Sequence, residues 1–285
     1  MENQQINIQL DSQTSVKITV YPSDNSTSPI ILILPAMGVK ASYYESFVQL
    51  LKSYELTAIT ADLRGLGLSS VRPSNKVDFG YLEMVEDLKT ITKVIKETFP
   101  NQKIYGLGHS LGGQIEALAQ AKYPNLFDGL ILIAANSVYY KCWTGKQRYI
   151  NLMGYYIFSL MSQVLGYFPG HKVGFGGKAA KTQIIDWSHV GKKGWYKLVG
   201  DNLDYETALN TLKMPVLAVY VEGDWLSPKA AMAHLYQKFN VAAPITNFTL
   251  TRAATGVKLN HFNWVKNSEN IVKVIKDWTI SSLTQ

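Results

Sequence analysis

Apolar residues follow two patterns along the chain: short runs, and longer stretches in which they recur every three or four positions. The short runs predict β-strands at residues 5–10, 15–21, 30–34, 56–60, 103–107, 129–134, 216–221 and 246–251. The runs at 5–10 and 15–21 alternate with polar residues and predict strands with one exposed face. The run at 30–34 is apolar throughout, which is typical of a central strand buried on both faces.

Helical spacing fills most of the intervals between these runs. Residues 81–98 end before Pro100 and carry apolar residues three or four positions apart, namely Val85, Leu88, Ile91 and Ile95. Further helices are predicted at 41–53, from about residue 111, after Pro228, and at the carboxyl end with Ile271, Val274, Ile275 and Trp278 on one face. Alternating strands and helices predict an α/β fold, with a mostly parallel central sheet and helices on both faces.

The alternation stops after the run at 129–134 and resumes at Pro215. We therefore expect one core formed by residues 1–135 and 206–285, with residues 136–205 inserted as a cap. The cap holds nine Lys or Arg against three Asp, so it supplies +6 of the net charge of +7. This charge would attract an anionic substrate or membrane, or form a solvated face. No nucleic-acid motif accompanies it, and no nucleic-acid partner is expected.

The longest apolar stretch lies inside this cap, at residues 149–169. A membrane-spanning helix needs about 20 predominantly apolar residues, whereas this stretch is interrupted by two glycines and by Asn151, Ser159, Ser162 and Gln163. We therefore expect a cap helix packed over the core and no transmembrane segment. A lid that lines an acyl pocket or touches a lipid surface is the alternative.

Composition limits the remaining classes. The chain has 285 residues, 47% of them hydrophobic, which is enough for a large core. Its single cysteine, Cys142, excludes an internal disulfide and a metal site built from cysteines. The first 13 residues are polar and do not resemble a secretory signal, which predicts a cytoplasmic protein. No metal or organic cofactor is expected, and the oligomeric state is left undetermined.

The segment Gly108-His109-Ser110-Leu111-Gly112 stands between a predicted strand and a predicted helix. A serine in such a turn takes a strained backbone conformation, and glycines two positions before and after it remove Cβ atoms that would clash. The helix start directs backbone N–H groups toward negative charge that develops beside Ser110 Oγ. This context is typical of a nucleophilic serine.

A serine hydroxyl needs a neighbouring base, and His261 is the expected one among five histidines. It follows the last predicted strand in a loop at the carboxyl edge of the sheet, from which its side chain would reach Ser110. The other four are expected to point away, to lie in a helix or to lie in the cap: His109, His234, His171 and His189.

The base needs an acid that orients it, and Asp224 is the expected residue. It lies in the loop at 222–228, directly after the predicted strand at 216–221, where ligand sites of parallel sheets gather. Glu222 is the alternative within the same loop, although its position closer to the strand favours it less.

These motifs together resemble the α/β-hydrolase superfamily, through GHSLGG at 108–113, EGDWLSP at 222–228 and NHF at 260–262. The resemblance implies an α/β-hydrolase fold with an inserted cap and a triad in the chain order serine, acid, histidine, which is the order found here.

Two further stretches extend the resemblance. The run DLRGLGLS at 62–69 is similar to the family's turn after the fourth strand, in which Asp62 and Arg64 have a structural role. Residues 34–38 and 166–170 resemble a narrower group of uncharacterised bacterial predicted hydrolases related to serine aminopeptidases and lysophospholipases.

The chain departs from the family at the oxyanion hole, the set of backbone N–H groups that binds negative charge on the reacting oxygen. The family usually has His-Gly after the third strand, where this chain has Pro35-Ala36. The resemblance then implies the N–H groups of Met37 and Leu111 as donors, with Gly38 as the alternative to Met37.

The implied reaction is cleavage of a carboxylic ester by a serine hydrolase through an acyl-enzyme, on a small substrate with an apolar or lipid-like acyl group. Thioester, lactone and amide cleavage would use the same groups. The alternatives are a peptidase or amidase of the serine-aminopeptidase type, and a ligand-binding protein that keeps the fold without turnover.

Overall fold

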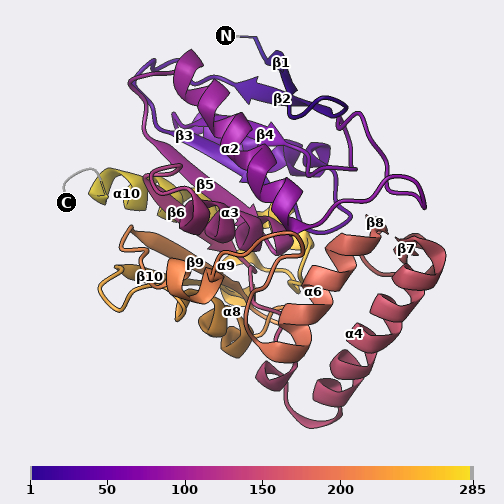
Figure 1. Cartoon of the computed structure of the whole chain (residues 1–285). Helices are drawn as coiled ribbons and strands as arrows, with labels where there is room; N and C mark the ends of the chain where they lie inside the picture. Colours follow the sequence, from indigo (N-terminus) through magenta and orange to yellow (C-terminus); the bar gives the residue numbers. More distant parts are fainter. Residues whose placement is uncertain (1, 283–285) are drawn as a thin grey trace.

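Eight strands form one sheet in the computed structural model, which describes residues 2–282 (Figure 1). Their order across the sheet is β1-β2-β4-β3-β5-β6-β9-β10. The strands are β1 (Gln4–Gln9), β2 (Ser15–Tyr21), β3 (Ile30–Leu34), β4 (Thr57–Ala61), β5 (Ile104–His109), β6 (Gly129–Ile133), β9 (Val216–Val221) and β10 (Ile245–Leu250). β2 pairs antiparallel with both β1 and β4, and all other neighbouring strands in the sheet pair parallel, which confirms the predicted, mostly parallel sheet.

Helices cover both faces of this sheet. On one face, α1 and α10 pack on apolar side chains that alternate along the strands, such as Ile31 and Ile33. On the other face, α2, α3 and α8 pack on the side chains at the alternate positions of the same strands, such as Leu32 and Leu34. The helices of the core are α1 (Glu45–Ser53), α2 (Tyr81–Thr98), α3 (Leu111–Lys122), α7 (Tyr205–Leu209), α8 (Lys229–Tyr236), α9 (Arg252–Thr255) and α10 (Glu269–Ser281). The predicted covering of both faces is therefore confirmed.

The turn at 62–69 is held by two charged side chains. Asp62 accepts the backbone N–H groups of Ala41 (2.7 Å) and Leu68 (2.8 Å), and so joins the turn to the start of the predicted helix at 41–53. That helix begins as a 3₁₀ turn, Ala41–Tyr44, and becomes α-helical as α1 only at Glu45.

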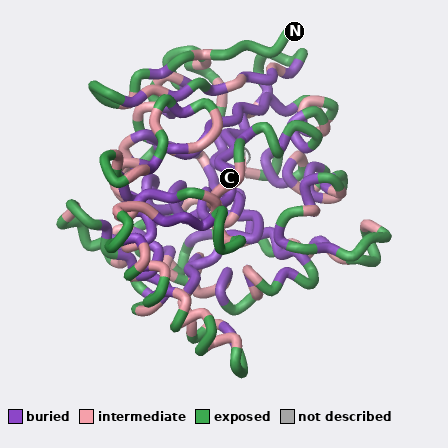
Figure 2. The backbone as a smooth tube through the Cα atoms, turned by 90° about the vertical axis from the view of Figure 1, so that its right-hand side faces the viewer, coloured by how far each residue is buried: buried purple, intermediate pink, exposed green. Residues whose placement is uncertain are grey.

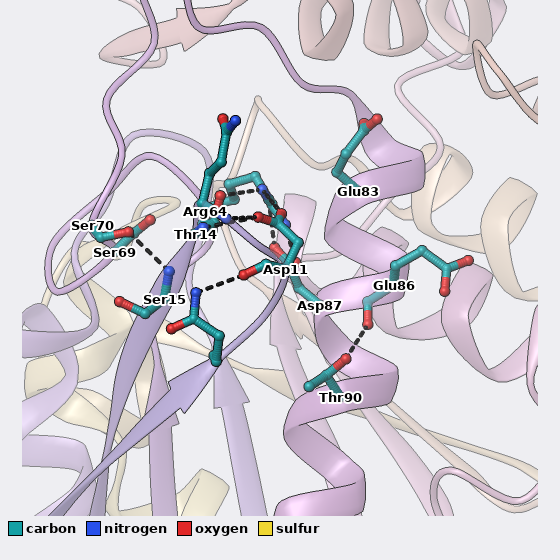
Figure 3. Close-up of polar contacts among 12 residues, drawn as sticks. Asp11, Thr14, Ser15, Arg64, Ser69, Ser70, Glu83, Glu86, Asp87 and Thr90 are labelled. Carbon is teal, nitrogen blue, oxygen red and sulfur yellow. Dashed lines mark hydrogen bonds and ion pairs between the residues drawn. The ribbon is translucent and has the colours of Figure 1, made fainter.

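Arg64 is the second of these side chains. Its guanidinium is buried between Asp87, which it binds with two nitrogens, and Asp11 at 2.7 Å, and it also donates to Thr14 (Figure 3). A guanidinium fork of this kind fixes the relative positions of its partners. Arg64 therefore ties α2 to the β1–β2 hairpin, as a structural role requires.

Most of the residues between β6 and α7 lie outside the two helix layers, at the lower right of Figure 1. They form η2 (Tyr140–Cys142), α4 (Gly145–Leu165), β7 (Tyr167–Pro169), α5 (Gly170–Val173), β8 (Lys178–Ala180) and α6 (Lys181–Lys193). α4 and α6 run side by side, and β7 and β8 pair antiparallel. We call this part the α4–α6 lobe; its definition as a separate cap stays a prediction. Within residues 2–282, none of the helices combines the length and the apolar character that crossing a membrane requires.

Candidate active site

Ser110 lies in the turn between the end of β5 and the start of α3. Its backbone has φ 54° and ψ −114°, a conformation that residues with a Cβ rarely adopt. The two flanking glycines explain how the turn closes. A Cβ on Gly108 would lie 2.1 Å from the backbone nitrogen of Gly113, and one on Gly112 would lie 2.4 Å from the carbonyl oxygen of Leu34. The sequence therefore places a hydroxyl on a sharp turn that only small neighbours allow.

The strand order reverses at this position. The chain moves from β3 to β4 on one side and then returns to β5 on the other side, so the carboxyl ends of β3 and β5 flank a topological switch point. Ligand sites of parallel sheets form at such points. Met37 follows β3 and Ser110 follows β5, and both line one cavity.

His261 and Asp224 are joined by a hydrogen bond of 2.6 Å between Nδ1 and Oδ2. The Asp224 side chain is fully buried, and its other oxygen accepts the backbone N–H groups of Leu226 (2.9 Å) and Ser227 (3.2 Å). The carboxylate is thereby fixed in place by its own loop. It in turn fixes the imidazole, whose Nε2 is left for other contacts.

The structure brings Ser110 and His261 to the same cavity. Within residues 2–282, no hydrogen bond joins their side chains. Hydrogen bonds of this kind are often long before substrate binds. The alternative acid, Glu222, lies elsewhere: it is exposed and accepts the backbone N–H of Arg252 at 2.6 Å.

The cavity has a volume of about 600 Å³ and opens between the core and the α4–α6 lobe. Large apolar side chains form most of its wall, and uncharged polar side chains form the rest apart from His261. The apolar part includes Val138, Trp143, Tyr155, Phe158, Phe175, Trp187, Trp225, Leu226 and Phe262, and the polar part includes Gln114, Asn136, Gln147, Asn151 and Asn260. A wall of this composition accommodates an apolar ligand with a few polar groups.

The two expected oxyanion donors, Met37 and Leu111, also line this cavity. Within residues 2–282, no hydrogen bond outside the regular helices and strands is donated by either N–H. Leu111 is the first residue of α3, where backbone N–H groups have no partner within the helix. Gly38, the alternative, has φ 74° and lies against Gly176 of the α4–α6 lobe, where a Cβ would be 2.5 Å from the backbone.

Sequence reasoning missed a buried network behind these groups. His109 points away from the cavity, as expected, and its Nδ1 lies 2.6 Å from the hydroxyl of Tyr44. Tyr44 also accepts the backbone N–H of Ala36, next to Met37, at 3.1 Å. On the other side, Trp264 donates to His109 Nε2 at 3.4 Å. No sequence signal links these residues, because they come from three distant segments.

The network connects both sides of the site. The ring centres of His109 and His261 are 4.8 Å apart. Burial, and secondarily the proximity of His261, lowers the pKa of His109 well below its ordinary value, so this imidazole stays neutral.

Comparison with known proteins identifies the chain as an α/β hydrolase. Residues 25–167, half of the chain, match the family described as serine aminopeptidase, S33. The chain belongs to this family. Rat (Rattus norvegicus) monoglyceride lipase is 30% identical over 105 residues, which are 37% of this chain and 34% of that protein. The match thus spans about a third of this curated relative.

Solved structures share the fold over nearly the whole chain. Est1E from Butyrivibrio proteoclasticus, bound to ferulic acid, has a TM-score of 0.66 at 13% identity and covers 98% of this chain and 100% of its own. A thermophilic esterase from Thermogutta terrifontis has a TM-score of 0.64 at 16% identity and covers 98% of this chain and 99% of its own. At such low identity these likenesses establish the α/β-hydrolase fold alone.

Proposed function

We propose that the chain is a serine esterase for carboxylic esters with an apolar acyl group, with Ser110 as nucleophile, His261 as base and Asp224 as the orienting acid. The observation that carries the proposal is the 2.6 Å bond between His261 and a fully buried Asp224, beside the cavity that holds the strained Ser110 turn. The similarity to monoglyceride lipase supports the same bond type.

The reaction follows from these positions. Ser110 Oγ attacks the ester carbonyl carbon while His261 Nε2 takes its proton, and the N–H groups of Met37 and Leu111 bind the oxyanion. His261 then gives the proton to the departing alkoxide, which leaves as the alcohol. Water, deprotonated by the same imidazole, attacks the acyl-enzyme and releases the carboxylic acid.

The cavity wall favours an ester over a peptide with a free amino terminus. An aminopeptidase must hold a cationic amine, for which a carboxylate is the natural partner. Apart from His261, this wall consists of apolar and uncharged polar side chains. Its apolar majority instead fits an acyl chain, whose transfer from water contributes about 0.8 kcal/mol for each buried CH₂.

A p-nitrophenyl ester series from acetate upward, together with fluorophosphonate labelling, tests this function. We expect labelling of the wild type and kcat/KM values that rise with acyl length until the cavity is full. Equal turnover of acetate and longer esters would contradict the apolar acyl pocket. No labelling of a well-folded wild type would favour a ligand-binding protein over an enzyme.

A further inference from the structure

The outer face of α4 is apolar. Seven large apolar side chains on this helix are between 48% and 74% exposed, and we call them the apolar stripe: Tyr149, Ile150, Met153, Tyr156, Ile157, Leu160 and Val164. Their spacing of mainly three and four positions places them on one side of the helix. Figure 2 turns the α4–α6 lobe toward the viewer, and much of the tube in its lower part is green or pink. Single exposed apolar residues are normal, but a contiguous patch marks an interaction site.

The helix carries apolar side chains on both of its sides. Phe158 and Met161 pack inward within the lobe, next to the buried Tyr155, Ser159 and Ser162, while the stripe faces outward. A helix at the surface of a water-soluble protein normally buries its apolar side. Packing against the core therefore does not explain the stripe. Contact with an apolar partner or layer outside the molecule would explain it.

Three lysines lie near the stripe. Lys192, at the end of α6, lies 4.8 Å from the ring centre of Tyr156, and Lys193 follows it. Lys178 lies over the ring of Tyr167, just beyond the carboxyl end of α4. Within residues 2–282, none of these three lysines forms an ion pair with an acidic side chain. Burial, and secondarily the charge of the neighbouring Lys193, lowers the pKa of Lys192.

The one acidic residue of α6 does not offset these charges. Asp186 is buried and is turned toward the core, where it accepts the backbone N–H groups of Tyr81 and Val199, each at 2.9 Å. An apolar stripe with unpaired lysines beside it fits a layer with apolar interior and anionic surface groups. A second copy of the chain would cover the stripe but would set the same lysines against each other.

The stripe is continuous with the candidate active site. Ile150 belongs both to the stripe and to the cavity wall, and Gly154 and Phe158 of the same helix line the cavity that holds Ser110. We propose that α4 lies on the surface of an anionic lipid membrane, with the stripe among the upper acyl chains and Lys178, Lys192 and Lys193 on lipid phosphates.

Vesicle co-sedimentation tests this surface. We expect the full chain to pellet with vesicles of phosphatidylcholine and phosphatidylglycerol, to bind pure phosphatidylcholine vesicles less, and to lose affinity as salt rises to physiological strength. Met153→Glu combined with Leu160→Glu should lower the partition coefficient by at least about 10-fold, because two apolar contacts are lost. Lys192→Gln with Lys193→Gln should lower it by about fivefold for each charge on the anionic vesicles alone.

Val241→Glu is the matched control, because Val241 is fully exposed in the loop before β10 and far from α4 in the sequence. It should bind vesicles as the wild type does. Turnover of a short soluble ester should be unchanged in the Met153/Leu160 variant, which shows that it folds. Ser110→Ala should also bind vesicles as the wild type does. The membrane proposal and the proposed esterase activity can therefore be disproved independently of each other.

Absence of binding to the anionic vesicles would overturn the proposal, as would equal binding by the wild type and the Met153/Leu160 variant. Sedimentation velocity gives the third outcome. If the chain does not bind vesicles but forms a dimer, and the Met153/Leu160 variant dissociates this dimer, the stripe is an interface with a second copy and the membrane proposal is wrong.

Discussion

Tyr44 Oη lies 2.6 Å from Nδ1 of His109 and also accepts the N–H of Ala36, so one buried hydroxyl joins the loop after β3 to the residue that precedes Ser110. The Ala36 N–H that this hydroxyl binds lies one residue before the N–H of Met37. We therefore regard Tyr44 as a positioning residue for the proposed oxyanion hole.

Tyr44→Phe keeps the ring and removes only this hydroxyl. Ala36 N–H then loses its buried partner, which costs about 1–3 kcal/mol of stability. A small displacement of Met37 would lower kcat by as much as about 100-fold with little change in KM. Steady-state kinetics on a soluble ester check this, with Tyr54→Phe as control, since Tyr54 is a partly exposed tyrosine after α1. A change confined to KM would contradict the positioning role.

Asp224→Asn separates the proposed acid from its alternative. The amide no longer stabilises the imidazolium that forms on His261, so kcat should fall by about 10⁴ without loss of the fold. Glu222→Gln, in the same loop but exposed, should keep kcat near the wild-type value. If the two variants were equally active, or if Glu222→Gln were the inactive one, the assignment of the acid would be wrong.

Gly112→Ala tests the close approach of α3 to β3. The added Cβ would lie 2.4 Å from the Leu34 carbonyl oxygen, and backbone atoms on both sides leave little room for adjustment. We expect a loss of about 1–3 kcal/mol in the free energy of unfolding. Gly154→Ala lies inside α4, and an added Cβ there would have no atom within 4 Å apart from the backbone of its own helix, so it should instead raise this free energy by about 0.5–1 kcal/mol. Urea unfolding of both variants gives the comparison, and similar midpoints would contradict it.

Asp186 predicts a particular pH dependence of stability. Burial raises its pKa from 3.8 to about 7, against the lowering effect of its two backbone N–H partners. Because the folded pKa is the higher one, the folded chain keeps a proton that the unfolded chain releases. The stability from this group is therefore full below about pH 4 and is lost as the pH rises through about 7.

Asp186→Asn cannot titrate and should lack this decline. Between about pH 4 and pH 7, the unfolding free energy of the wild type should fall relative to that of the variant by up to about 1.4 kcal/mol per pH unit. Urea unfolding at a series of pH values measures both curves. Curves that stay parallel through this range would show that Asp186 is ionised in the folded state.

Much of the core and of the candidate site could be predicted because the signals are local. The strands at 15–21, 30–34 and 216–221 and the helix at 81–98 have the predicted bounds. The turn at Ser110 could be predicted because its flanking strand, glycines and helix are adjacent in the sequence.

Features that depend on long-range packing could not be predicted. Asp186 counts in the sequence as one of the three acidic charges of the predicted cap, yet it is buried and accepts the backbone N–H of Tyr81, 105 positions away. Tyr44 lies in the predicted helix at 41–53, and this prediction gives no indication of a contact with His109, 65 positions on. The run at 149–169 predicts a cap helix packed over the core. Apolar spacing alone does not indicate which side of a helix faces outward, and in this helix the apolar stripe faces outward.

Fluorophosphonate labelling of the wild type beside Ser110→Ala tests the central proposal most directly. If the strained turn, His261 and Asp224 form an activated nucleophile, the wild type takes up one label at Ser110 and the variant takes up none, while both unfold at similar temperatures. Labelling that persists in Ser110→Ala, or a folded wild type that does not react, would contradict the proposed serine nucleophile.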